Sequence, residues 1–470
     1  MAGELALAPT VLAAPETVSN TIKVGNGPSA VAITPDGKAV YVVNTGDDTV
    51  SVISTATGTV TRTIPVGHTP NSVAITPDGT AAYVVNNADH TLSVISTATG
   101  TVTRTIPVSS EPYSVAITPD GTAAYVTDDA GTSVSVISTA TGTVTRTIPI
   151  GDVSYGVAIT PDGSAVYVAT GDSGHVSVIS TVTGTVTQTI SLAPVAYSVA
   201  ITPDGAAAYV TNGDATGVVS VISTVTGTVT KTISVGRGPF AVAISPDGAA
   251  AYVTNYRDNT LSVISTATGT VTRTVQVSNG PHGVAITPDG TAAYVTNISG
   301  DTVSVLKAAT ATSLTSSANP LTAGEYVTYT ASVNPNPLSG TVSFTDGNST
   351  VPGCSAVPVT PAGNAQCRVT YSAAGLHRIR AAYSSNARYA GSTSSALTES
   401  INAATTSPTS APPSPTPTSP TSPAAPTTSP SLANTGGPVR NVTVTGLGVL
   451  LVGCGLLFAG TRGRNKPKHG

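Results

Sequence analysis

A unit of 42 residues repeats seven times in the first two thirds of this 470-residue chain. Each copy contains the motif Thr-Pro-Asp-Gly or Ser-Pro-Asp-Gly, and a tyrosine follows six residues after the proline. The spacing between prolines is 42 residues, with a single step of 43. The motif prolines are Pro35, Pro77, Pro119, Pro161, Pro203, Pro246 and Pro288, and the tyrosines are Tyr41, Tyr83, Tyr125, Tyr167, Tyr209, Tyr252 and Tyr294. A repeat of this length restricts the chain to folds in which each unit packs against its neighbours.

One unit predicts four short strands, at residues 73–76, 81–85, 91–96 and 101–106. The strand segments are rich in Val, Ile, Thr and Tyr, which favour β-structure. Pro77-Asp78-Gly79 predicts a tight turn between the first two strands, because proline presets φ and glycine accepts a positive φ. Four antiparallel strands in about 42 residues are typical of a propeller blade. The sequence therefore predicts an all-β chain with a seven-bladed β-propeller over residues 18–307.

The two ends of the repeat region are truncated in a complementary way. The seventh copy stops after its third strand, and the missing fourth-strand pattern stands near the start as Thr21-Ile22-Lys23-Val24-Gly25. This N-terminal segment is predicted to complete the last blade. That pairing would close the ring and leave no open sheet edge.

The units that read YVVN, YVTN and VAITPDG resemble the YVTN family of bacterial and archaeal surface-layer β-propellers. The resemblance covers residues 18–306 and implies a location at the cell surface more than a defined chemistry. One reading that follows from it is a purely structural surface-layer component. The repeat tyrosines are predicted to pack between blades, and the aspartates of the Pro-Asp-Gly motifs to act as turn residues.

Variation among the seven copies indicates which face of the propeller carries the functional loops. The first-to-second and third-to-fourth loops are monotonous, whereas the second-to-third loops and the crossovers between blades are diverse. Functional loops vary on a rigid scaffold, so the diverse face is the predicted working face. One crossover position, two residues before the first-strand valine, reads Ser29, Asn71, Tyr113, Tyr155, Tyr197, Phe240 and His282 along the blades.

The last five of these residues are predicted to form an aromatic cup at the channel mouth. Such rings suit a glycan, a small ring compound or a protein loop. The alternative is that they only plug the channel and pack on each other. No catalytic residue, metal ligand set or cofactor is predicted, since no HxH, CxxC, HExxH or GxSxG spacing occurs. The acidic pairs Asp47-Asp48 and Asp128-Asp129 are expected to be solvated, with contact to Ca²⁺ at a loop as the alternative.

Charge and composition narrow the choice of function. Only 9% of residues are charged and the formal net charge is −4, which argues against a nucleic-acid partner. A row of basic residues marks the fourth strands: Arg62, Arg104, Arg146, Lys231 and Arg273. It is interpreted as protection of blade edges against aggregation, with a basic rim for an anionic polymer as the alternative. The leading functional hypothesis is a non-enzymatic binding or adhesion module, and the runner-up is a lactonase-like or quinoprotein-like propeller enzyme.

Residues 308–402 change character and alternate between strands and Gly, Asn or Pro turns. This segment resembles the bacterial Ig-like domains of surface adhesins, which implies a β-sandwich spacer. Cys354 and Cys367 lie within it, and a disulfide between them is predicted for an exported protein. The alternative is two buried thiols.

The ends of the chain carry targeting patterns. Residues 403–431 are a Pro/Ser/Thr-rich tract, predicted to be a disordered linker. The pentapeptide Leu432, Ala433, Asn434, Thr435, Gly436 resembles the LPXTG sortase motif in its LAXTG form, and an apolar run at 442–460 and a basic tail follow it. Residues 432–470 are therefore predicted to be a sorting signal with one transmembrane helix, and the resemblance implies cleavage after Thr435 by a sortase and transfer to a peptidoglycan precursor.

These patterns predict a secreted protein, covalently anchored to the wall of a Gram-positive bacterium, that meets the membrane only through this span. A simple C-terminal membrane anchor is the alternative. Residues 1–17 are interpreted as part of a signal peptide whose start lies upstream, because the apolar run has no preceding Lys or Arg. The alternative there is a leaderless cytoplasmic protein.

Overall fold

The structure is a computed structural model that describes residues 17–404, apart from residues 109–110, 172, 193–194, 214–216 and 387–388. The described residues form strands and turns only, which confirms the all-β prediction. Among them no helix is long and apolar enough to cross a membrane. The predicted transmembrane run, the sorting motif and nearly all of the predicted linker and signal segment lie outside the described residues.

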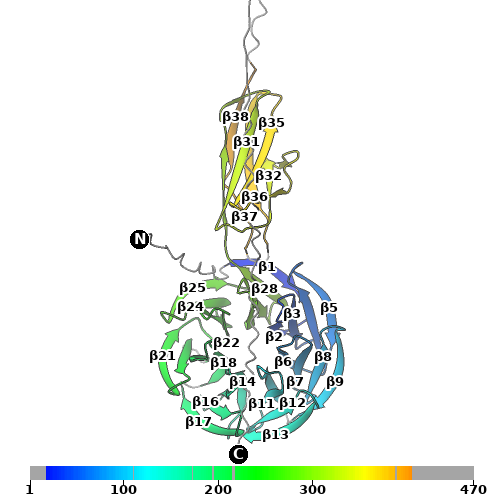
Figure 1. Cartoon of the computed structure of the whole chain (residues 1–470), viewed down its shortest axis with the longest axis vertical. Coiled ribbons are helices and arrows are strands. Elements are labelled where there is room, and N and C mark those ends of the chain that lie inside the picture. Colours follow the sequence, from blue (N-terminus) through cyan, green and yellow to red (C-terminus); the bar gives the residue numbers. More distant parts are fainter. Residues whose placement is uncertain are drawn as a thin grey trace, which may run out of the picture. The chain divides into compact units, whose positions relative to one another are not determined.

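Residues 17–307 form seven four-stranded antiparallel sheets arranged as blades in a ring (Figure 1). The first, innermost strands are β2 (Pro28–Ile33), β6 (Pro70–Ile75), β10 (Pro112–Ile117), β14 (Ser154–Ile159), β18 (Ala196–Ile201), β22 (Pro239–Ile244) and β26 (Pro281–Ile286). The second strands are β3 (Ala39–Asn44), β7 (Ala81–Asn86), β11 (Ala123–Asp128), β15 (Ala165–Thr170), β19 (Ala207–Asn212), β23 (Ala250–Asn255) and β27 (Ala292–Asn297). The third strands are β4 (Thr49–Ser54), β8 (Thr91–Ser96), β12 (Ser133–Ser138), β16 (His175–Ser180), β20 (Val218–Ser223), β24 (Thr260–Ser265) and β28 (Thr302–Lys307). The outermost strands are β5 (Thr59–Pro65), β9 (Thr101–Pro107), β13 (Thr143–Pro149), β17 (Thr185–Ser191), β21 (Thr228–Ser234), β25 (Thr270–Gln276) and β1 (Thr17–Lys23).

The first strand of each blade starts earlier than the sequence suggested. β6 begins at Pro70, three residues before the predicted start, and its pairing with β7 shifts register between Pro70 and Ser72. The irregular pairing hides this part of the strand from a pattern of alternating residues. As a consequence, the variable crossover position lies inside the innermost strand.

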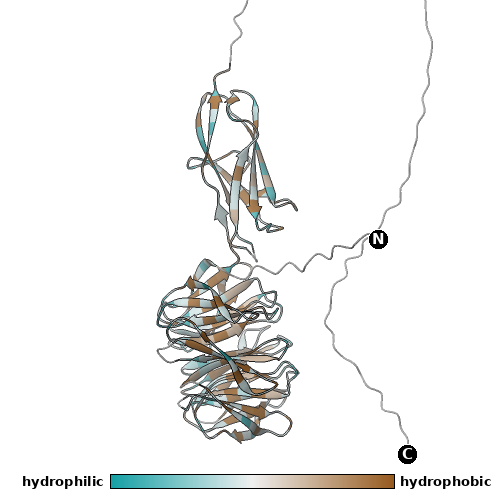
Figure 2. Cartoon of the chain, turned by 90° about the vertical axis from the view of Figure 1, so that its left-hand side faces the viewer, coloured by the Kyte–Doolittle hydropathy of each residue, from teal (hydrophilic) through white to brown (hydrophobic). Residues whose placement is uncertain are grey.

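Hydrophobic residues recur along the strands of the blades (Figure 2), and they pack in clusters shared by neighbouring blades. Tyr83 of the second blade, for example, shares a buried cluster with Val115 and Ala124 of the third. Burial raises the pKa of the Tyr83 phenol above its usual value. The predicted packing role of the repeat tyrosines is confirmed.

The ring is closed by the N-terminal strand, as predicted. β1 pairs antiparallel with β28, and Ile22 lies opposite Val303. Ile22 also joins a buried cluster with Tyr294 of the last blade and Val40 of the first. The two ends of the propeller are therefore held by both hydrogen bonds and apolar contact.

The segment after the propeller is a two-sheet sandwich. One sheet contains β29 (Ala311–Ser316), β31 (Tyr326–Asn334) and β35 (Asn364–Thr370). The other contains β30 (Leu321–Thr322), β38 (Leu397–Asn402), β36 (Gly375–Tyr383), β32 (Thr341–Asp346) and β33 (Ser349–Thr350), with β34 (Val357–Pro358) beside β32 and β37 (Ser392–Thr393) beside β36. Cys354 and Cys367 are joined by a disulfide in its buried core, beside Tyr329 and Phe344.

Candidate binding site at the channel mouth

The structure brings the five predicted cup residues together as one continuous arc. Each is the second residue of an innermost strand, from β10 to β26. Successive ring centroids are 5.0 Å apart for Tyr113–Tyr155, 5.3 Å for Tyr155–Tyr197, 5.2 Å for Tyr197–Phe240 and 3.7 Å for Phe240–His282. All five residues are half-buried, and the imidazole of His282 is desolvated. The rings thus pack on one another, as the packing interpretation expects, and they also contribute to the surface of the channel mouth.

Two glycines make room for the stacked rings. A Cβ atom on Gly213 would lie 1.9 Å from Cδ2 of Tyr197, and one on Gly171 would lie 2.3 Å from Cε2 of Tyr155. Both glycines immediately follow the second strand of their blade. Asp129 holds this position in the third blade, and there Tyr113 is tilted by 60° against Tyr155, compared with 27° between Tyr155 and Tyr197. In the fourth and fifth blades, the missing side chain at this position thus leaves room for the stacked pair Tyr155 and Tyr197.

The threonine of the YVTN motif holds the arc's backbone in place. Thr127 Oγ1 donates to the carbonyl of Tyr155 at 2.6 Å, and Thr254 Oγ1 donates to that of His282 at 2.8 Å. Each bond runs from a second strand to the first strand of the next blade. The motif therefore couples neighbouring blades at the height of the arc.

His282 ends the arc and links the last blade to the first. Its Nδ1 lies 2.7 Å from the carbonyl oxygen of Ser29, so Nδ1–H donates and Nε2 carries the lone pair of the neutral ring. Burial lowers the pKa of His282 to about 4, although the bond to Ser29 opposes this shift. At neutral pH the imidazole is thus an uncharged ring stacked on Phe240.

The other side of the mouth is polar. Thr45 Oγ1 donates to Ser29 Oγ at 2.8 Å, and Asn87 Nδ2 donates to the carbonyl of Pro112 at 3.1 Å. Burial and the nearby Glu111 raise the pKa of the Asp129 carboxyl. The mouth therefore presents aromatic rings on blades three to seven and hydrogen-bonding groups on blades one to three.

A pocket of about 310 Å³ opens at the aromatic end of the mouth. Tyr197, Phe240 and His282 form one wall, and Tyr256 and Arg257 from the loop after β23 form another. The side chain of Tyr256 is 41% exposed. Tyr256 and Arg257 were not among the predicted site residues; their position in a diverse loop was the available signal.

The acidic loop residues are mostly structural. Asp47 Oδ2 accepts the backbone N–H of Asn26 at 2.7 Å, and Asp48 Oδ1 accepts that of Thr69 at 2.8 Å. Asp128 is buried, and its carboxylate accepts the N–H of Gly131. The expectation of solvated pairs was therefore wrong for Asp128, whereas Asp47 and Asp48 remain accessible to solvent and also bind the crossover backbone. In the described part of the chain, no group of three or more His, Cys, Asp or Glu residues is placed to hold a metal ion.

Comparisons with known proteins agree with the two folded parts. The model of the YNCE-like beta-propeller family matches residues 17–130, and that of the bacterial Ig-like domain (group 3) matches residues 314–402. Among solved structures, a chain of Kuenenia stuttgartiensis hydrazine synthase is similar over 65% of this chain and 99% of its own, with 22% identity and a TM-score of 0.56. No curated protein matches the sequence. These findings confirm a β-propeller and a bacterial Ig-like domain, and the structural likeness concerns the fold alone.

Proposed function

We propose that this chain is a surface-displayed binding protein whose propeller holds a ring-bearing ligand, such as a sugar residue, in the pocket at the channel mouth. The observation that carries the proposal is the pocket of about 310 Å³ between the aromatic arc and the loop of Tyr256 and Arg257. Aromatic faces combined with a few polar groups suit a sugar ring, which has apolar faces and a polar edge. Arg257 adds a fixed positive charge and directional donors for ligand oxygens.

An enzymatic role is the alternative, and it would require convergent acids, bases or a metal at the same mouth. The titratable ring in this pocket is His282, whose Nδ1–H already binds the carbonyl of Ser29. Nε2 keeps its lone pair, but burial lowers the pKa of His282 to about 4, so the ring is a weak base at neutral pH and serves better as a wall of the pocket than as a proton-transfer group.

Display on the cell wall completes the proposal. It rests on the order of the pentapeptide 432–436, the apolar run 442–460 and the basic tail. The Ig-like domain would serve as a spacer between the propeller and this anchor.

The test is a glycan-array screen of the chain without its apolar C-terminal run, followed by affinity measurement on the best glycan. Tyr197→Ser should weaken binding about tenfold or more, because a ring contact contributes roughly 1–3 kcal/mol. Serine already occupies this position as Ser29. Tyr113→Ser is the matched control, since Tyr113 belongs to the arc but does not line the pocket. Equal affinity of Tyr197→Ser and the parent would contradict the proposal.

A further inference from the structure

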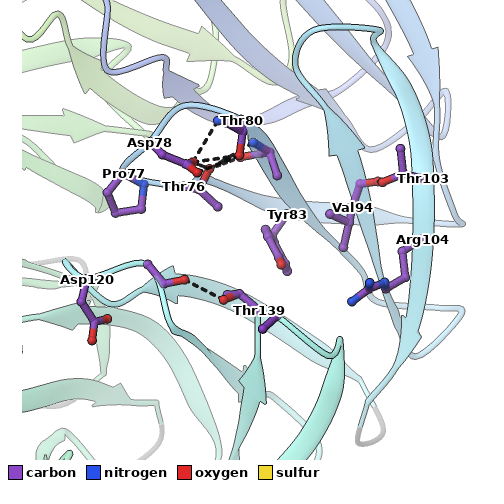
Figure 3. Close-up of a pocket in the computed structure, with 13 residues that line it drawn as sticks. Thr76, Pro77, Asp78, Thr80, Tyr83, Val94, Thr103, Arg104, Asp120 and Thr139 are labelled. Carbon is purple, nitrogen blue, oxygen red and sulfur yellow. Dashed lines mark hydrogen bonds between the residues drawn. The ribbon is translucent and has the colours of Figure 1, made fainter.

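The monotonous face of the propeller, opposite the cup, carries pits between neighbouring blades. One pit of about 660 Å³ lies between the second and third blades (Figure 3). Another of about 360 Å³ lies between the fourth and fifth blades. Equivalent repeat positions line both pits: the turn Pro and Asp and the repeat Tyr of one blade, and the turn Asp and Gly and a third-to-fourth-loop residue of the next.

The inner wall of each pit is a contact between two Pro-Asp-Gly turns. A Cβ on Gly121 would lie 3.6 Å from Cδ of Pro77 in the preceding blade, and all seven turns repeat this contact at 3.4 to 3.8 Å. The seven pairs are Gly37–Pro288, Gly79–Pro35, Gly121–Pro77, Gly163–Pro119, Gly205–Pro161, Gly248–Pro203 and Gly290–Pro246. The pair Gly37–Pro288 closes this ring of contacts between the last blade and the first. In each pair the gap between the glycine and the proline ring therefore has room for a methyl group.

The outer wall is a long side chain that crosses to the next blade. Arg146 Nη1 donates to the carbonyl of Thr183 at 2.7 Å, and Gln188 Nε2 donates to that of Gly227 at 3.1 Å. Lys231 donates in the same way to Thr268. Arg146 and Lys231 of the basic row, and Gln188 at the same strand position, thus tie their blades to the third-to-fourth turn of the next blade, a contact that neither interpretation of the row anticipated.

Each pit is lined by two turn aspartates, a repeat tyrosine and a proline, and the larger pit also by Arg104. Tyr83 points into the pit between Arg104 and Pro77 (Figure 3). Asp78 Oδ1 accepts bonds from Thr76 Oγ1 and from the N–H of Thr80, and the carboxylate keeps further acceptor capacity. A ligand rich in hydroxyl groups would donate to the turn carboxylates of each pit and pack against the proline and tyrosine, and in the larger pit it would also meet the guanidinium of Arg104.

We propose that these pits are repeated subsites for one polysaccharide chain that runs over the monotonous face. A pit of 360 to 660 Å³ is large enough for one or two sugar rings. The two pits are built from equivalent repeat positions, and such sites match a ligand that is itself a repeat. Engagement of two linked sites raises the apparent affinity by about 10²–10⁴ over a single site. This site is separate from the cup and does not depend on the function proposed for it.

The test uses substitutions that narrow a pit at its rim and leave the glycine–proline pairs of the turns unchanged. Ala140 is exposed on the rim of the 660 Å³ pit, and the same repeat position in the 360 Å³ pit is Val225. The variant Ala98→Leu/Ala140→Leu should therefore fold like the parent; it narrows the 660 Å³ pit at Ala140 and changes the equivalent exposed position of the preceding blade at Ala98. Val144→Leu, on the outer strand and away from the pit lining, is the matched control.

The readout is affinity electrophoresis in native gels that contain dextran, arabinogalactan or polygalacturonate, each compared with its own mono- to trisaccharides. We expect at least one polymer to retard the parent with an apparent affinity at least about 100-fold higher than that of its fragments. The apparent affinity of the double leucine variant for this polymer should be at least tenfold lower than that of the parent. Val144→Leu and Tyr197→Ser should bind the polymer as the parent does. Retardation by none of the three polymers would overturn the proposal, as would equal retardation of the double leucine variant. Loss with Tyr197→Ser alone would also overturn it and assign binding to the cup.

Discussion

At the scale of single residues, His282 makes the free energy of unfolding depend on pH. Its folded-state pKa of about 4 lies below the ordinary value of 6.5 because the ring is buried. Between these values the unfolded chain binds a proton that the folded chain does not. The free energy of unfolding therefore falls as the pH drops from 6.5 to 4, and is fully retained above that window. The shift corresponds to a loss of up to about 3 kcal/mol.

The test of this prediction is urea unfolding of the propeller at pH 7 and pH 4.5. His282→Phe should remove most of the acid-induced loss seen in the parent, since phenylalanine already serves in the neighbouring blade as Phe240. His68→Asn is the control, because Asp48 raises the pKa of His68 and gives it the opposite sign. If the parent and His282→Phe lose stability equally on acidification, the neutral stacked imidazole is not the cause.

At the scale of elements, we expect the closing strand β1 to stabilise the propeller through Ile22. Ile22 is 6% exposed and bridges the last and first blades, whereas Val18 on the same strand is 36% exposed. Ile22→Ala should cost about 2–4 kcal/mol of propeller stability through the lost burial and the remaining cavity. Val18→Ala should change stability by well under 1 kcal/mol. Equal effects of the two substitutions in urea unfolding would mean that β1 lies on the ring without holding it closed.

The same scale shows what the sequence could predict and why the rest was hidden. Within one 42-residue unit, strand order, the Pro-Asp-Gly turn and the aromatic register are all local patterns, and the complementary truncation revealed β1. Contacts between units were hidden, because a repeat does not state which residues of neighbouring copies meet. The sequence does not reveal that Gly213 makes room for the ring of Tyr197. Nor does it reveal that Arg146 donates to the carbonyl of Thr183 in the next blade. The structural role of the acidic loop residues was hidden for the same reason, because Asp48 accepts the backbone N–H of Thr69 in the crossover to the next blade.

At the scale of the whole molecule, the proposed wall anchor links the binding face to a cell. In the sortase reaction implied by the motif, the bond after Thr435 is cleaved and the threonine carbonyl is joined to a peptidoglycan precursor. Thr435→Ala should therefore move the protein from the wall fraction to the membrane or the medium, while the folded propeller stays intact because it ends far upstream at Lys307.

Cell fractionation followed by muramidase digestion measures this directly: the parent should be released with wall fragments attached, and the variant should not. Thr427→Ala, in the Pro/Ser/Thr tract before the motif, is the matched control and should fractionate like the parent. Wall attachment of Thr435→Ala at the parental level would leave a non-covalent or membrane anchor as the explanation and refute the sortase route.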